Sequence, residues 1–338
     1  MVKAYVLHEN DAWMEPLRAA FEAEGVPHEE WFLDQGTLDI DRAPPEGVFY
    51  NRMSASSHTR DHRYAAEYTA GVLAWLESHG RRVVNSGRAL QLEISKLAQY
   101  AALNAHGVRT PRTVAAAGRG RIVEAAERFE GPVIVKHNRG GKGLGVRLFR
   151  ERAALARYVD SAAFEAPIDG ITLVQTYIQA PEPFITRAEF VGGRFLYALR
   201  VDTTQGFELC PADECQPGDA FCAAAPAAGP RFQVDLGFRH PILARYERFL
   251  AANGVDVAGI EFIADRDGEV WTYDVNTNTN YNAEAEAAAR APLTGMRAIA
   301  RHLGDELDRI YGPAAHANFR GAKQSLPPFA EPRKSVAS

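Results

Sequence analysis

Residues 259–282, GIEFIADRDGEVWTYDVNTNTNYN, form the stretch that decides the fold of this chain. Two apolar runs, Gly259–Ala264 and Glu269–Val275, flank the tetrapeptide Asp265-Arg266-Asp267-Gly268. Asp and Gly between runs of alternating apolar residues are typical of the turn of a β-hairpin. The stretch therefore predicts two antiparallel strands joined by a short turn.

The side chains of this predicted hairpin divide between two faces. Successive side chains of a strand point to opposite faces, so the length of the turn decides which residues share a face. With a turn of two or four residues, Glu261 shares a face with Thr272, Asp274 and Asn276, whereas a three-residue turn reverses the relation. The opposite face is predicted to be the core face, with Ile260, Phe262, Trp271, Tyr273 and Val275.

The polar face of the hairpin has the composition of a magnesium site. Glu261, Asp274 and Asn276 offer two carboxylates and an amide oxygen, which are hard ligands that suit Mg²⁺ with water and phosphate oxygens completing its shell. A solvated acidic face of a sheet is the alternative, because most surface charges are solvated. The Asn-rich run 276–280 ends the strand at this point, and Asn is common in turns that carry sites. We therefore predict a metal site.

The composition is that of an ordinary globular protein. The chain has 338 residues, a length typical of two or three domains, with 46% hydrophobic and 24% charged residues. A net charge of -5 gives no electrostatic reason to expect nucleic-acid binding. No apolar run approaches the roughly 18 residues that a membrane span needs, and the first residues carry no secretory signal pattern. We expect a cytoplasmic protein that binds neither nucleic acid nor membranes.

The three cysteines, Cys210, Cys215 and Cys222, are expected to be reduced. A small, odd number of cysteines without a signal pattern indicates a reducing compartment. Their spacings differ from the short C-x2–4-C pairs of zinc sites, so no structural zinc is predicted; a zinc site completed by a fourth ligand such as His240 is the alternative.

The first part of the chain predicts a small parallel sheet. Val2–His8 and Gly47–Arg52 read as strands, with a helix over Ala12–Glu24 between them. Sheets of this kind bind ligands at the carboxyl ends of their strands. Arg52 lies at such an end and is a candidate contact for an anionic substrate, with an ordinary surface arginine as the alternative.

A Gly-rich turn lies between two predicted strands, Pro132–Lys136 and Val146–Phe149. Such a turn can fold over phosphates with its backbone N–H groups, although a plain hairpin turn fits equally well. Lys136 enters the turn and could meet a phosphate as a point charge. A helix predicted over Leu90–His106 carries a further lysine, Lys96. The glycines of the turn are Gly140, Gly141, Gly143 and Gly145.

Together these pieces resemble the ATP-grasp superfamily, and RimK-like glutamate and amino-acid ligases most closely. The resemblance runs from about Val48 to Leu303. It implies an α/β (α+β) architecture, in which an N-terminal Rossmann-like domain precedes the ATP-grasp fold. The implied division is an N-terminal α/β domain, a small lid subdomain, a C-terminal subdomain with the metal site, and a tail: residues 1–88, 89–170, 171–312 and 313–338.

The resemblance also implies roles for residues that contact the nucleotide. Lys96 and Lys136 match the family's two lysines that contact phosphates, and Arg139–Val146 matches its Gly-rich lid. The hinge that binds adenine through its backbone resembles Gln175-Thr176-Tyr177-Ile178, with Gln175, Tyr177 and Ile178 as nucleotide contacts. Glu182 follows where the family often has an acidic residue for the ribose.

Two arginines and the metal residues complete the match. Arg187 matches a family arginine that could hold a substrate carboxylate, and Arg200 matches one that neutralises charge in the reaction. The acidic, acidic-x-Asn metal pattern matches the hairpin. The family commonly has Glu in place of Asp274 and often Asp in place of Glu261. The Asn-rich run also departs from the family, and Asn278 within it is a candidate substrate contact.

The implied activity is ATP-dependent formation of an amide or peptide bond through an acyl phosphate. Lys136 and Arg200 are the implied catalytic residues, because phosphoryl transfer needs charge neutralisation above all. The implied cofactors are ATP and Mg²⁺, with Mn²⁺ as an alternative ion. The implied partners are a carboxylate and an amine on small molecules or peptides, and a homo-oligomer is compatible with the sequence. The alternatives are an ATP-grasp kinase and a non-catalytic ATP-binding module.

Overall fold

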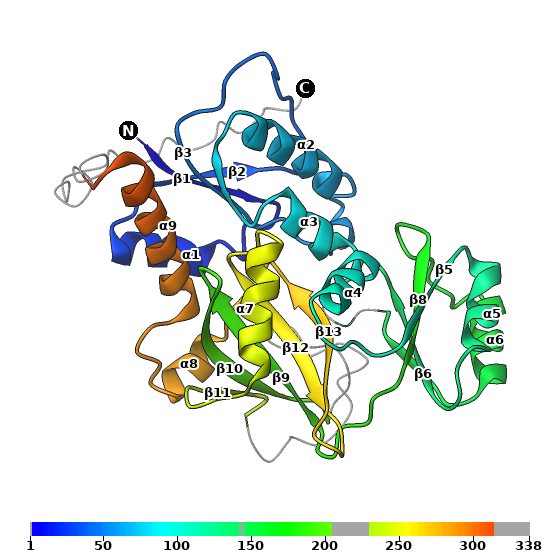
Figure 1. The fold of residues 1–338 in the computed structure, drawn as a ribbon. Coiled ribbons are helices and arrows are strands. Elements are labelled where there is room, and N and C mark those ends of the chain that lie inside the picture. The colour runs from blue at the N-terminus through cyan, green and yellow to red at the C-terminus, as the bar shows by residue number, and fades with distance from the viewer. Residues whose placement is uncertain (1, 142, 144, 205–229, 314–338) are drawn as a thin grey trace, which may run out of the picture.

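The computed structural model describes residues 2–141, 143, 145–204 and 230–313 of the chain, and these contain three β-sheets (Figure 1). The first sheet lies at the top of Figure 1, the second at the right and the third in the lower centre. The three cysteines and the predicted tail from residue 314 onward lie outside the described residues. None of the helices in the described part is long and apolar enough to cross a membrane.

The first sheet is parallel, as the sequence predicts, and helices cover both of its faces. One face packs on α1 and α9, and the other packs on α2 and α3. Burial on both faces explains the continuous apolar sequence of β3, GVFYN, which is entirely buried. In spatial order the strands are β2 (His28–Phe32), β1 (Lys3–His8), β3 (Gly47–Asn51) and β4 (Arg82–Val84), and the helices are α1 (Glu15–Glu24), α2 (Ala65–Ser78), α3 (Gly87–Ile94) and α9 (Gly295–Tyr311).

The second sheet is antiparallel. The Gly-rich turn joins the two strands at one edge of this sheet, Val133–His137 and Arg147–Phe149. A small apolar core lies between it and α5 and α6. In spatial order its strands are β5 (Thr113–Ala117), β8 (Ile171–Thr176), β6 (Val133–His137) and β7 (Arg147–Phe149), with helices α5 (Ile122–Ala126) and α6 (Arg152–Asp160). The division of the chain into domains stays a prediction. Strand β8 begins just after the predicted boundary at residue 170, but it pairs with β5 and β6, which precede that boundary.

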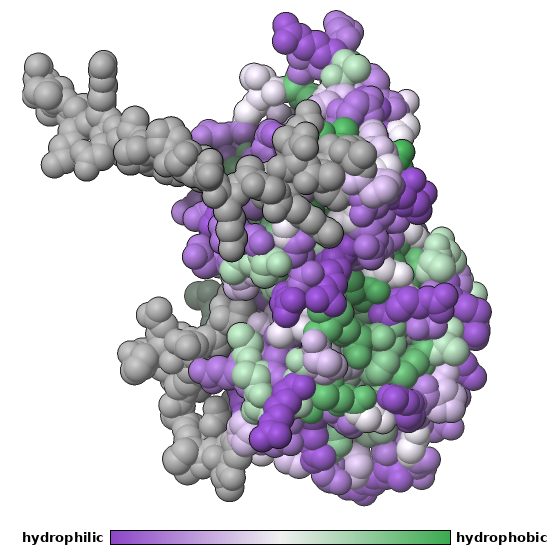
Figure 2. Space-filling view, turned by 90° about the vertical axis from the view of Figure 1, so that its left-hand side faces the viewer, coloured by the Kyte–Doolittle hydropathy of each residue, from purple (hydrophilic) through white to green (hydrophobic). Residues whose placement is uncertain are grey.

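The third sheet contains the hairpin predicted from residues 259–276. Helix α7 and part of α4 pack with one face of this sheet in the largest apolar core. In spatial order its strands are β11 (Phe232–Asp235), β10 (Arg194–Asp202), β9 (Phe184–Val191), β12 (Ala258–Ala264) and β13 (Val270–Asn276), and the nearby helices are α4 (Lys96–Ala105), α7 (Ile242–Ala252) and α8 (Ala283–Ala288). Figure 2 shows a mostly hydrophilic upper part of the molecule and more hydrophobic residues over this lower part.

The turn of the β12–β13 hairpin has three residues, and a bulge further along compensates for it. Arg266–Gly268 form the turn, because Asp265 N donates to Glu269 O at 3.0 Å and Gly268 has a left-handed φ of 76°. A three-residue turn alone would separate Glu261 from Asp274. The register then shifts by one residue, so that Glu261 pairs with Asp274 after all.

The prediction of a shared face is therefore confirmed for Glu261, Asp274 and Asn276, but it is wrong for other residues of the hairpin. Thr272 pairs with Phe262 and is fully buried on the core face, where it bonds to Tyr246. The sequence pattern predicts Trp271 and Tyr273 as core residues. Trp271 instead pairs with Ile263 outside that core, and the bulged residue Tyr273 lines a cavity beside the hairpin.

The helix predicted over residues 90–106 is broken into α3 and α4 at Ser95. Ser95 has extended backbone angles, and its hydroxyl accepts a hydrogen bond from Ala98 N as the N-cap of α4. The break makes Lys96 the first residue of α4 rather than a mid-helix residue. Lys96 thus lies at the point where α4 begins beside the hairpin.

Candidate functional site

A cavity of about 460 Å³ lies between the second sheet and the hairpin of the third. One end is mainly apolar and is lined by the chain from Thr176 to Ile185, together with Ile134 and Val146. The other end is polar and is lined by Lys96, Lys136, the Gly-rich turn and the predicted metal residues Glu261, Asp274 and Asn276. A cavity with an apolar slot and a charged end suits a ligand that carries a flat apolar group and an anionic group.

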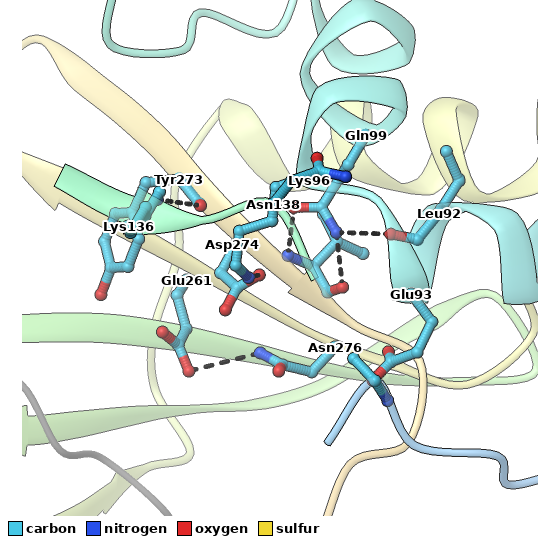
Figure 3. Close-up of polar contacts among 12 residues, drawn as sticks. Leu92, Glu93, Lys96, Gln99, Lys136, Asn138, Glu261, Tyr273, Asp274 and Asn276 are labelled. Atoms are coloured by element: carbon cyan, nitrogen blue, oxygen red, sulfur yellow. Dashed lines mark hydrogen bonds and ion pairs between the residues drawn. The ribbon is translucent and has the colours of Figure 1, made fainter. Parts of the chain in front are cut away.

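At the polar end Lys96 is paired with Asp274. The Nζ atom of Lys96 donates to Oδ1 of Asp274, and the two side chains keep only 11% and 18% of their surface exposed. Figure 3 shows both side chains pointing toward one another from α4 and β13. Exclusion of water from this contact makes the attraction stronger than that of a surface pair.

Lys136 reaches the same end of the cavity from β6. Its Nζ atom donates to the hydroxyl of Tyr100 at 2.5 Å and lies 3.5 Å from the carbonyl oxygen of Tyr273. Burial, with a smaller effect from the nearby charge of Lys96, lowers the pKa of Lys136 to about 7. Both of these hydrogen-bond partners are neutral oxygens, so an anionic ligand would add a charged partner that favours the protonated form of this buried lysine.

Glu261 is held by one cation and one amide. Its Oε1 atom accepts from Arg187 at 3.0 Å and from Nδ2 of Asn276 at 3.4 Å. Burial raises the pKa of Glu261, an effect that Arg187 opposes and the charge of Asp274 reinforces. The charge of Asp274 thus makes it harder for Glu261 to stay ionised, and a nearby positive charge relieves that cost.

The donor set of these three residues fits a magnesium ion. Two carboxylates and an amide oxygen are hard ligands, and such a set leaves coordination positions for water and phosphate oxygens. Within the described residues, no three His, Cys, Asp or Glu side chains gather to hold a metal ion by themselves. Any ion at Glu261, Asp274 and Asn276 therefore depends on ligands that this side-chain set does not supply.

The Gly-rich turn lies over the polar end, with Gly140, Gly141 and Gly143 lining the cavity. Gly145 is not among the lining residues, although it has a left-handed φ of 74°, and a Cβ atom at this position would lie only 3.3 Å from the His137 ring. Arg139 fixes the start of the turn, because it is buried and its Nη1 atom donates to Glu67 of α2 at 2.8 Å. The turn is thus tied to the first sheet's layer.

The predicted hinge residues line the apolar end, namely Gln175, Tyr177, Ile178 and Glu182. The side chain of Gln175 donates to Thr113 at 2.9 Å, and the backbone N–H of Tyr177 donates to Pro132 O at 3.2 Å. Glu182 accepts from Arg200 at 2.7 Å, and more than half of its side chain is exposed.

The structure does not bring Arg200 to the polar end. Arg200 pairs with Thr186, whereas Arg187 pairs with Leu199 on one side and with Glu261 of β12 on the other. Because side chains alternate, Arg200 leaves the sheet on the face opposite Arg187. Half of its side chain is exposed, and its guanidinium stacks on Phe184 at 3.6 Å. The catalytic role predicted for Arg200 has no support in this placement.

The three predicted substrate contacts are not among the residues that line the cavity, and they are already bonded within the protein. Arg187 is buried and donates to Glu189 at 2.6 Å, to Glu261, and to Thr279 at 2.5 Å. Arg52 is 2% exposed and donates to Asn278 Oδ1 at 3.2 Å. Further contacts of Arg52 run to Thr279 O, to Asn280 Oδ1 at 2.8 Å and to Trp13 O at 3.0 Å. Arg52 and Asn278 therefore meet each other.

Sequence reasoning missed two residues that organise the site. Tyr100 accepts from Lys136 and donates to Tyr273 O at 2.6 Å. It lies four residues after Lys96, a helical spacing that puts both on one face, and this signal could have identified it. Glu93 accepts from Thr277 N at 2.7 Å and from Ala55 N at 3.2 Å, and burial raises its pKa. The sequence carries no comparable signal for Glu93.

Comparison with known proteins places the fold among ATP-grasp enzymes. The chain is similar to a RimK-domain ATP-grasp protein from Sphaerobacter thermophilus, with a TM-score of 0.62 and 18% identity over 89% of this chain and 99% of the other. It is also similar to D-alanyl-alanine synthetase A from Vibrio cholerae, with a TM-score of 0.61 and 11% identity over 90% and 98% of the two chains. The chain therefore has the ATP-grasp fold.

In sequence, the chain is similar to β-citrylglutamate synthase B of Mus musculus, with 32% identity over 138 residues. It is also similar to N-acetylaspartylglutamate synthase A of the same organism, with 28% identity over 138 residues. In each case the match covers 40% of this chain and 35% of the relative, so the chain spans about a third of the length of these relatives. No protein-family model matches the chain.

Proposed function

We propose that this chain, whose fold is ATP-grasp, is an ATP-dependent carboxylate–amine ligase. One observation carries the proposal. A single cavity joins an apolar slot to a polar end where two lysines, two carboxylates and an amide converge under a Gly-rich turn. That combination suits a nucleoside triphosphate and an ion that neutralises its phosphates.

In the proposed complex, adenine occupies the apolar slot along residues 175–178, and Glu182 is near enough to the slot to contact the ribose. The phosphates lie at the polar end, where Lys96 and Lys136 offer N–H donors and positive charge. Glu261, Asp274 and Asn276 would hold Mg²⁺, for which Mn²⁺ is an alternative. The ion, when bound, supplies neutralisation of phosphate charge.

The proposed reaction has two steps. A substrate carboxylate oxygen attacks the γ-phosphorus of ATP, the bond to the bridging oxygen breaks, and ADP leaves with an acyl phosphate formed. An amine nitrogen then attacks the acyl carbon, loses a proton, and expels inorganic phosphate as the amide forms. Lys136 and Lys96 hold the phosphates through the first step, where electrostatic stabilisation is the main contribution a protein can make.

The relatives suggest the class of substrate. Glutamate-containing products appear in the names of β-citrylglutamate synthase B and N-acetylaspartylglutamate synthase A. Solved structures of similar fold include a D-cycloserine synthetase and an ATP-grasp ligase complexed with its precursor, Mg and ADP. We propose small molecules or peptides as carboxylate and amine donors. A homo-oligomeric state and a cytoplasmic location stay predictions.

A coupled assay of ADP release tests the proposal. The purified chain is given MgATP with a panel of carboxylates, first alone and then with a panel of amines that includes glutamate. We expect ADP release that requires one carboxylate and one amine together, with equimolar inorganic phosphate and a product lighter by one water than the sum of the substrates.

The same assay separates the alternatives. ADP release that requires an acceptor hydroxyl and yields a phosphorylated product would identify a kinase. Binding of ATP without turnover on any acceptor, in a chain that keeps both lysines and all three metal residues, would favour a non-catalytic module and contradict the ligase proposal.

A further inference from the structure

The two carboxylates at the polar end are each paired with a cation of the protein. Asp274 is paired with Lys96 from α4, and Glu261 is paired with Arg187 from β9. Lys136 adds a further basic group at the same end of the cavity. A divalent ion that approached alone would meet carboxylates that are already neutralised, beside a basic group that repels it.

The two pairs differ in how readily they can separate. Arg187 is held on three sides by Glu189, Glu261 and Thr279, and its guanidinium geometry is fixed. The ammonium of Lys96 is held by Asp274 alone within the described part of the chain, and it ends a flexible side chain that faces the cavity from the first position of α4. Lys96 can therefore move to another anion without disrupting the fold.

We propose that Lys96 is the counter-ion of Asp274 in the nucleotide-free protein and makes metal binding depend on the nucleotide. This inference rests on the proposed function, because the anion that takes Lys96 away from Asp274 is the phosphate group of ATP. The pairing keeps a lone divalent ion out. Phosphate oxygens attract Lys96, and Asp274 then becomes available together with Glu261 and Asn276. Lys96 is thus a positioning residue for the metal as well as a phosphate contact.

The experiment measures metal binding with no nucleotide present. MnCl₂ is titrated into the nucleotide-free full-length chain, and free Mn²⁺ is followed by its electron paramagnetic resonance signal. Wild type is expected to bind Mn²⁺ weakly. Lys96→Met is expected to bind Mn²⁺ at least about tenfold more tightly, because one partly buried ion pair no longer competes for Asp274. In the same preparations, calorimetry is expected to show ADP binding weakened about tenfold or more.

Two matched variants serve as controls. Lys3→Met makes the same substitution in a half-exposed surface pair with Glu29, far from the cavity, and should change neither measurement. Lys96→Met combined with Asp274→Asn should lose the gain in Mn²⁺ binding, because the freed ligand is no longer a carboxylate. Thermal melts of every variant confirm that the protein is folded.

The outcomes separate this inference from the proposed function. Mn²⁺ binding that is no tighter in Lys96→Met than in wild type would overturn the counter-ion role, even if ADP binding falls as the ligase proposal requires. Tighter Mn²⁺ binding with unchanged ADP affinity would keep Lys96 as the counter-ion of Asp274 but overturn the dependence on the nucleotide, because phosphate would then not be what draws Lys96 away.

Discussion

Two groups of cations lie next to the acidic hairpin and the segment that follows it, and they differ in how their side chains are held. Lys96 and Lys136 line the cavity, and each donates to few partners. Arg52 and Arg187 are not among the lining residues; they are buried, with several hydrogen bonds each. The lysines are placed to exchange partners with a ligand, whereas the arginines are placed to hold the segments that carry the metal residues.

The chemistry of the two side chains explains the difference. A lysine ammonium is a compact charge on a flexible chain, and it can follow an anion that arrives. An arginine guanidinium is planar and satisfies several acceptors at once, and Arg52 does so with neutral oxygens of residues 278–280 and of Trp13. The comparison indicates that sequence position alone does not show which cation meets the substrate.

The largest effect is expected for Asp274→Asn, which removes the negative charge of one proposed metal ligand that lines the cavity. ADP formation should fall by at least about 100-fold, because the proposed ion loses one of two carboxylates. The free energy of unfolding should fall by only about 1 kcal/mol, because Lys96 loses its partner while Glu261 loses a repulsive neighbour. An ADP assay and urea melts measure both. Near-normal turnover would show that the metal site is elsewhere.

Lys136→Met should separate binding from stability. ATP affinity should fall about 10- to 100-fold, because the variant loses one charge-assisted hydrogen bond to a phosphate. Calorimetry with a non-hydrolysable ATP analogue measures this change. The nucleotide-free variant should be more stable than wild type near pH 7, because a buried lysine with a lowered pKa disfavours the folded state.

The pH dependence of this stability difference follows from the sign of the shift. The pKa of Lys136 is about 7 in the folded chain and about 10.5 in an unfolded one. Between these values the unfolded chain binds the extra proton, so the stability of wild type rises with pH relative to the variant. The advantage of Lys136→Met should be largest below about pH 7 and vanish above about pH 10.5. Thermal melts across this range that show a constant difference would contradict the assignment.

Arg52→Met tests the group of buried arginines. Removing the guanidinium leaves the buried oxygens of Thr279 and Asn280, and the partly buried one of Asn278, without their donor, so the free energy of unfolding should fall by about 3 kcal/mol in urea melts. Arg109→Met, which breaks an exposed pair with Glu269, is the matched control and should cost less than about 1 kcal/mol. Equal losses in the two variants would show that Arg52 is not a clamp.

Much of the site could be predicted from the sequence where residues are close along the chain. The hairpin pattern brought Glu261, Asp274 and Asn276 together, and apolar runs identified the strands around the Gly-rich turn. The three-residue turn and the bulge at Tyr273 could not be predicted, because a bulge changes the register without a distinctive residue. The exchange of Thr272 and Tyr273 between the two faces follows from these two irregularities alone.

Long-range hydrogen bonds of polar side chains are equally hidden. Nothing in the sequence indicates that Arg52 meets Asn278, more than two hundred residues away, or that Glu93 holds both Ala55 and Thr277. Such contacts depend on how the first sheet packs on the third, and local patterns carry no information about that packing. Sequence position therefore suggests substrate contacts for Arg52 and Arg187, whereas the structure gives both arginines protein partners.

A second bulge accounts for the placement of Arg200. The turn at Gly192-Gly193 pairs Arg194 with Val191, and a regular hairpin continuing from it would pair Arg200 with Ile185 on the face of the cavity. The register shifts between Phe195 and Tyr197, so Arg200 pairs with Thr186 instead. One extra residue in β10 thus turns the guanidinium to the other face.

The smallest effect is therefore expected for Arg200→Met. Arg200 belongs neither to the lysines that line the cavity nor to the buried arginines. Its side chain is half-exposed and bonds to Glu182, which is also exposed, so the free energy of unfolding should change by less than about 1 kcal/mol. ADP formation should change by less than about threefold, since Arg200 lies on the face away from the polar end and the loss of a surface ion pair costs little free energy.

Arg187→Met, on the opposite face of the same hairpin, is the contrasting variant. It should lose both stability and activity, because it leaves Glu189 and Glu261 buried without their cation. A loss of activity in Arg200→Met as large as in Asp274→Asn would contradict the expectation that Arg200 stays away from the reacting groups. Arg200 would then join the lysines as a cation that meets the substrate.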